Sequence, residues 1–110
     1  RQLDGALASI DALEEVVNAV KEYCKGKKKK KMVPVYLDGG IRRGTDVVKA
    51  LALGATAVGL GKPVFFALSV GGEEAVVQML EMLKKEIVAA MALCGCARVE
   101  DITRDLVTRR

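Results

Sequence analysis

The sequence predicts an α/β fold with two parallel strands packed against helices. Stretches of helical periodicity alternate with two short apolar runs, 33–38 and 55–60. Strands joined by helical crossovers are parallel, and helices then cover both of their faces. Two strands alone do not form a stable sheet, and a (β/α)8 barrel takes about 250 residues. We therefore expect the C-terminal fragment of a (β/α)8 TIM barrel, or a small α/β unit that pairs with another part.

Each element follows from local signals. From Ser9 to about Tyr23, apolar side chains recur at helical spacing opposite charged ones, which predicts an amphipathic helix. A lysine-rich segment at 25–31 interrupts the pattern and is expected to be a surface loop. Gly54 and Gly95 stand where helices are expected to end. The remaining elements are expected to be strand 33–38, helix 44–53, strand 55–60, a short helix 64–70 ended by Gly71-Gly72, a long helix 73–93 and a last short helix 99–107.

The composition indicates a packed core and few surfaces for stacking bases. Of the 110 residues, 51% are hydrophobic and only 4% are aromatic, with no Trp. The net charge of +4 owes most to one run, Lys27 to Lys31, which contains no aromatic residue. Nucleic-acid binding usually needs a basic surface with aromatic or helical recognition elements. We therefore expect residues 1–110 to form one part of a globular domain without a nucleic-acid partner.

The cysteines, the apolar runs and the start of the chain limit the classes of function that the sequence allows. Cys94-Gly95-Cys96 has a shorter spacing than zinc sites use, and the chain has no histidine, so no metal site is expected. Free thiols are typical of intracellular proteins. No run reaches the roughly 18 apolar residues of a membrane span, and no leader peptide is visible. The chain starts at Arg1 rather than Met, which indicates a truncated or processed sequence.

Glycines and basic residues follow both expected strands at the same relative place. The first strand is followed by Gly39-Gly40-Ile41-Arg42-Arg43-Gly44, and the second by Gly61-Lys62-Pro63. Glycine lets backbone N–H groups approach a ligand, and the start of a helix attracts anions. Arg42 or Arg43, together with Lys62, can add charge-assisted hydrogen bonds. Because barrels commonly bind phosphate between the loops after strands seven and eight, we expect both turns to serve one phosphate site.

Asp38, at the end of the first strand, suits a different part of the same ligand. Its carboxylate would accept hydrogen bonds from ribityl or ribose hydroxyls just beyond a phosphate. The competing interpretation is a plain turn at Asp38-Gly39-Gly40 with solvated arginines. The second junction, Gly61-Lys62, favours the phosphate site over that plain turn.

No catalytic residue is expected within the chain itself. Without histidine, no imidazole can act as an acid or a base. Ser9 and Ser69 have no partners for a catalytic triad. The sequence therefore predicts a part that binds a ligand more readily than it carries out a reaction.

The stretch 35–55 resembles the C-terminal part of the FMN-dependent L-2-hydroxy acid dehydrogenases and oxidases, of the flavocytochrome b2 (lactate) or glycolate oxidase type. The resemblance continues through Gly61-Lys62-Pro63 and the helix 80–93, and it includes Arg1-Gln2-Leu3-Asp4. The Asp-Gly-Gly-Ile-Arg stretch also occurs in similar form in inosine monophosphate dehydrogenases. The combination of Arg1-Gln2-Leu3-Asp4 with 42–46 is more particular to the hydroxy acid group.

The resemblance implies specific roles for individual residues. FMN would be held through its ribityl phosphate by Asp38, Gly39, Gly40, Ile41, Arg42, Gly61 and Lys62. Arg1 would pair with the substrate carboxylate, and the catalytic histidine would lie a few residues before Arg1, outside this chain. Lys62 stands where the family usually has arginine, which keeps the charge but loses the planar fork.

The resemblance also implies partners and a location. The chain would need the N-terminal part of its barrel, act on a small 2-hydroxy acid such as lactate or glycolate, and form a homo-oligomer in an intracellular compartment: the cytoplasm, a mitochondrion or a peroxisome-like organelle. The final Thr108-Arg109-Arg110 is not a peroxisomal tripeptide. Two alternatives remain at this point: a non-catalytic phosphate- or nucleotide-binding α/β module, and an inosine monophosphate dehydrogenase-like barrel piece.

Overall fold

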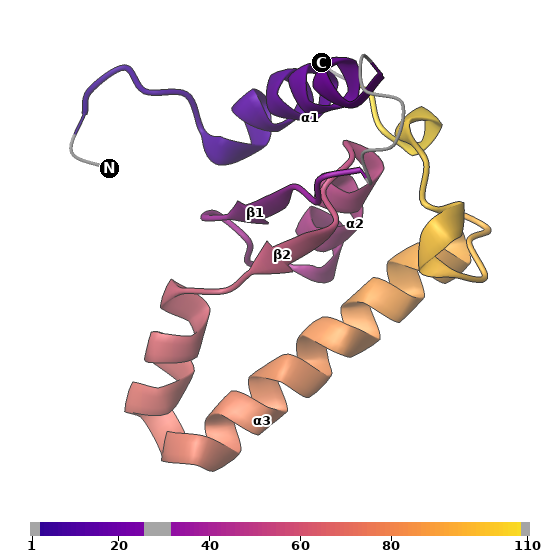
Figure 1. Cartoon of the computed structure of the whole chain (residues 1–110). Helices are drawn as coiled ribbons and strands as arrows, with labels where there is room; N and C mark the ends of the chain where they lie inside the picture. The colour runs from indigo at the N-terminus through magenta and orange to yellow at the C-terminus, as the bar shows by residue number, and fades with distance from the viewer. Residues whose placement is uncertain (1–2, 26–31, 109–110) are drawn as a thin grey trace.

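The computed structural model describes residues 3–25 and 32–108, so most of the lysine-rich segment lies outside the described residues. Helices and strands alternate along the chain before a long helix and two short turns (Figure 1). The elements are α1 (Ser9–Lys25), β1 (Tyr36–Asp38), α2 (Gly44–Ala52), β2 (Ala57–Gly59), α3 (Lys62–Leu93) and the 3-10 turns η1 (Val99–Asp101) and η2 (Arg104–Leu106).

The two strands form a parallel sheet, as the sequence predicts. Tyr36 lies opposite Ala57, and Asp38 lies opposite Gly59. Both strands are shorter than the apolar runs that predict them. Because the pair is parallel and in this register, the turns that follow Asp38 and Gly59 leave the sheet at the same edge.

Only one face of the sheet is covered by helices in the described chain. Leu37 is 4% exposed and belongs to a core cluster with residues of α1 and α2. Tyr36, on the other face of the same strand, is 68% exposed. The prediction that both faces are buried is therefore wrong for this chain, because α1 and α2 both pack on the Leu37 side.

Close packing between helices fixes how α2 sits in the fold. Gly54, just after α2, has a φ of +103°, the left-handed conformation expected at a helix end. A Cβ at Gly44 would lie 2.4 Å from the backbone nitrogen of Ile87 in α3. The start of α2 therefore touches the backbone of α3 directly, and no larger residue fits there without moving one of the helices.

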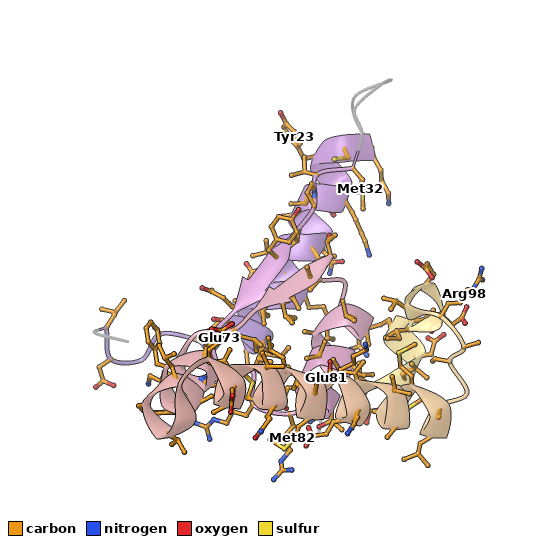
Figure 2. The ribbon with its side chains drawn as sticks, turned by 90° about the horizontal axis from the view of Figure 1, so that it is seen from below. Tyr23, Met32, Glu73, Glu81, Met82 and Arg98 are labelled. Atoms are coloured by element: carbon orange, nitrogen blue, oxygen red, sulfur yellow. The ribbon has the colours of Figure 1, made fainter. Side chains whose placement is uncertain are left out.

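Helix α3 consists of two parts that meet at a break. Gly71 and Gly72 have non-helical backbone angles, and Gly72 has a φ of +65°. The sequence predicts this break. The first part leaves the sheet and the second runs back past α2 toward the C-terminal turns (Figure 1). Leu83 and Ile87 of the second part pack against the core cluster, whereas Met82 is 61% exposed and points away from the sheet (Figure 2).

By length and composition alone, α3 is long and apolar enough to cross a membrane, whereas the sequence predicts no membrane span. The break at Gly71-Gly72, however, falls inside this helix and divides it into two shorter parts. The second part carries six charged side chains, which are Glu73, Glu74, Glu81, Lys84, Lys85 and Glu86. A span places few charges in the apolar layer, so these features favour a helix on the surface of a domain.

The C-terminal segment differs from the expected short helix 99–107. It forms two separate 3-10 turns, with extended backbone at Ile102 and Thr103 between them. Ile102 is buried in a second core cluster with Val48, Ala52 and Cys96, and this anchor interrupts the helix. Arg104 Nε lies 2.6 Å from Glu14 Oε1, which joins the tail to α1.

The buried thiol of Cys96 gives the fold a testable pH dependence. Burial, followed by the nearby Cys94 and Asp101, raises the pKa of Cys96 above 9.0. The unfolded chain then loses this proton first as the pH rises, so the contribution to stability is complete below pH 9.0 and is lost above it. We expect urea unfolding to show this loss, and Cys96→Ser to remove it. An unchanged pH profile in Cys96→Ser would contradict the assignment.

Candidate functional site

A cleft of about 850 Å³ opens at the edge of the sheet where both strands end. Its walls come from the turn after β1, the turn after β2 and the start of α3. The lining residues are Asp38, Gly39, Gly40, Ile41, Arg42, Gly59, Leu60, Gly61, Lys62, Pro63 and Phe66. All seven residues predicted to hold the cofactor therefore lie around one cleft. Arg1, the predicted substrate residue, lies outside the described residues.

The turn after β1 depends on its two glycines. Gly39 and Gly40 have φ angles of +89° and +78°, which side-chain-bearing residues rarely adopt. Ile41 follows and is 5% exposed, so it fastens the turn to the core. A Cβ at Gly40 would meet no atom within 4 Å, so the space beside the backbone is open on the side of the cleft.

The start of α3 faces the same cleft with free backbone donors. Gly61 is the N-cap residue, and no side chain caps this helix. Within the described part of the chain, the amides of Gly40, Gly61 and Lys62 have no hydrogen-bond partner. Unpaired amides and the positive end of the helix dipole attract an anion. The exposed side chain of Lys62 adds a full positive charge beside them.

The start of α2 differs from the sequence-based expectation of free donors for an anion. The amides of Arg42 and Arg43 donate to Asp46 Oδ2, at 3.1 and 2.9 Å. The amide of Gly44 donates to Glu86 Oε2 at 2.7 Å. Two carboxylates therefore occupy this helix start. The expectation was wrong for α2, because its donors are satisfied from within the fold.

Of the residues that line the cleft, Phe66 was not singled out in the sequence. Phe66 is 66% exposed and borders the cleft one turn into α3, and Gly59, Leu60 and Pro63 complete the wall. The spacing of Lys62 and Phe66, one helical turn apart, is the signal that could have placed Phe66 on the same side. Among the described residues, no group of three or more acidic or cysteine side chains could hold a metal ion.

A second cleft of about 540 Å³ shares Gly39, Gly40 and Ile41 with the first. It lies between the segment before α1, the start of α1 and the start of α2, and its wall is mainly apolar, including Leu3, Leu7 and Ile10. A Cβ at Gly39 would lie 3.4 Å from Ser9 Oγ, so α1 approaches the turn closely from this side. The glycine turn is thus a thin wall between two clefts.

The sequence profile of the FMN-dependent dehydrogenases matches residues 1–109. The chain belongs to this family. A peroxisomal (S)-2-hydroxy-acid oxidase from Oryza sativa subsp. japonica is 57% identical over 107 residues, which cover 97% of this chain and 27% of that protein. An L-lactate oxidase from Nostoc sp. is 54% identical, covering 93% of this chain and 26% of that protein. The predicted family is confirmed.

Solved structures of this FMN-dependent family superpose on the chain. A mandelate oxidase variant with a monooxide FMN adduct matches with a TM-score of 0.81 and 46% identity, over 94% of this chain and 30% of that one. Flavocytochrome b2 with sulfite bound matches with a TM-score of 0.85 and 40% identity, over 96% and 26%. The chain spans about a quarter of the length of the curated relatives it matches. Its two strands and their helices are part of a TIM barrel, as predicted.

Proposed function

We propose that this chain is the part of an FMN-dependent 2-hydroxy acid oxidoreductase that binds the phosphate of FMN. The observation that supports the proposal is the convergence of two glycine-rich turns on one cleft at the same edge of a parallel sheet. The donor set fits a phosphate, because unpaired amides and two cationic side chains surround the opening. Loss of FMN binding on removal of Arg42 and Lys62 tests this part of the proposal.

Each residue of the cleft would contact a different part of FMN or support the turn that does so. The amides of Gly40, Gly61 and Lys62 would donate to phosphate oxygens, and Arg42 and Lys62 would neutralise its charge. Asp38, which ends β1 with an exposed side chain, would accept hydrogen bonds from the ribityl hydroxyls. Gly39 and Ile41 would shape and anchor the turn that presents these groups.

The substrate is proposed from the resemblance and from the names of the relatives. An L-2-hydroxy acid of the lactate or glycolate type would be oxidised to the 2-oxo acid. FMN, when bound, supplies the acceptor for the two electrons. Arg1 would hold the substrate carboxylate with its bidentate fork. The histidine that takes the substrate proton would come from the segment before Arg1 in the whole protein.

Replacing Arg1 in the full-length holoenzyme tests the substrate role. Arg1→Lys keeps the charge but loses the fork, so we expect KM for the hydroxy acid to rise about tenfold or more. FMN affinity should stay unchanged, because Arg1 is not assigned to the cofactor. Weaker FMN binding by Arg1→Lys, with an unchanged KM at saturating FMN, would contradict this division of roles.

Two further properties belong to the same proposal. In the whole protein, the N-terminal part of the barrel would pack against the exposed face of the sheet around Tyr36 and against the exposed Phe65 and Phe66. The whole protein is proposed to form a homo-oligomer.

We also propose an intracellular location. Several relatives are named as peroxisomal enzymes, which supports an organelle of that kind.

A further inference from the structure

Two thiols, those of Cys94 and Cys96, flank the sharp turn that ends α3. Gly95 between them has a φ of +73°. The amides of Gly95 and Cys96 donate to the carbonyl oxygens of Ala92 and Met91, at 3.2 and 2.9 Å. This is the Schellman arrangement, in which the residue after the glycine packs back on the last helical turn. The turn therefore directs Cys96 into the protein, whereas Cys94 is exposed.

The buried sulfur of Cys96 joins α2 to the turn η1. Cys96 is 8% exposed and shares the second core cluster with Val48, Ala52 and Ile102. Its thiol donates to the carbonyl oxygen of Asp101 at a distance of 3.5 Å. Beyond this contact the chain folds back toward α1 (Figure 1). The position of this one sulfur atom thus helps to hold the end of the chain against α2.

The same sulfur lies close enough to Cys94 to bond with it. Sγ of Cys96 is 3.9 Å from the carbonyl oxygen of Cys94. Cα atoms two residues apart are separated by at most about 7 Å, and the turn at Gly95 shortens that separation. Disulfides form over roughly 4.4–6.8 Å between Cα atoms. Rotation of both side chains would join the two sulfurs, but it would withdraw Cys96 from the core cluster.

We propose that Cys94 and Cys96 form a reversible disulfide that releases the C-terminal segment, residues 97–108, from α2. The disulfide removes the proton that Cys96 donates to Asp101 and pulls the sulfur away from the cluster. A disulfide that closes over a single intervening residue is strained and therefore easily reduced. The oxidant assigned to this step is a small-molecule disulfide, such as oxidised glutathione.

The reaction proceeds by two thiol–disulfide exchanges. Burial raises the pKa of the Cys96 thiol, so the exposed Cys94 reacts first. Its thiolate attacks one sulfur of the small disulfide, whose S–S bond breaks and releases one thiol. When the segment opens locally, the sulfur of Cys96 attacks that of Cys94, and the second small thiol leaves. The two protein thiols lose two electrons and two protons, and the small disulfide gains them as two thiols.

The test incubates the full-length protein in buffers of reduced and oxidised glutathione, alkylates the remaining thiols and digests with trypsin. Both cysteines lie in one tryptic peptide, 86–98, and Cys24 lies in another, 22–25. We expect mass spectrometry to show peptide 86–98 without alkylation and lighter by two hydrogen atoms, a change that dithiothreitol reverses. We also expect trypsin to cut the native oxidised protein after Arg98 or Arg104 about tenfold faster or more, because the segment is released.

Two serine variants provide the controls. Cys94→Ser keeps the buried thiol and should abolish both the disulfide and the faster cleavage, whereas Cys24→Ser should change neither. The proposal is wrong if peptide 86–98 keeps two free thiols, or if glutathione stays attached to Cys94 as a mixed disulfide. A disulfide that forms without faster cleavage would overturn the release of the segment.

Discussion

Replacing Arg42 or Lys62 by alanine in the full-length protein is expected to weaken FMN binding about 10- to 100-fold each. Both side chains are exposed at the cleft and would form charge-assisted hydrogen bonds with one phosphate. Because both would contact the same dianion, the double variant should lose less than the product of the single effects. Fluorescence titration of apo-protein with FMN measures these affinities.

The control for this prediction is Lys84→Ala, which removes an exposed lysine from the second part of α3. It changes net charge by the same amount as Lys62→Ala but does not line the cleft. FMN affinity should therefore stay close to that of the unmodified protein. If Lys84→Ala and Lys62→Ala weakened binding equally, overall charge rather than a phosphate contact would account for the effect.

Substitution of Gly44 by alanine is expected to destabilise the fold by about 2–3 kcal/mol. The new Cβ would lie 2.4 Å from the nitrogen of Ile87 and 2.5 Å from the carbonyl carbon of Glu86, so backbone must move. That movement would also lengthen the hydrogen bond from the Gly44 amide to Glu86. Chemical denaturation of the full-length protein measures the free energy of unfolding.

Thr45→Ala provides the matched control for Gly44→Ala. Thr45 is the next residue of α2 and is exposed, so alanine there removes little packing and creates no contact with α3. We expect its free energy of unfolding to change by less than about 0.5 kcal/mol. A Gly44→Ala protein as stable as the Thr45→Ala protein would show that α2 and α3 do not meet as closely as described.

Much of the candidate site could be predicted from local sequence. The apolar runs before Gly39 and Gly61 identify the strands, and glycine next to a basic residue identifies the turns. The parallel arrangement then brings the turns together, because parallel strands end at the same edge. The cleft follows from these features without knowledge of distant contacts.

The hydrogen bond between Glu86 and the amide at the start of α2 could not be predicted in the same way. Glu86 lies 42 residues from Gly44, and the bond between them depends on how α3 returns after its break. Likewise, the buried position of Ile102 depends on packing against Val48 and Ala52, and this contact divides the expected last helix into two turns. Apolar pattern alone does not encode such long-range partners.

The double-glycine break gives the long helix two independent tasks. Its first turn directs backbone donors toward the cleft. Glu86, more than three turns beyond the break, accepts a hydrogen bond from the start of α2. Deleting one residue between 73 and 85 would rotate Glu86 about the helix axis by about 100°. The turn of α3 that faces the cleft would stay unchanged. In this family, insertions and deletions should therefore be tolerated before the break or after Glu86. They should be excluded from the stretch 73–85 that joins the two.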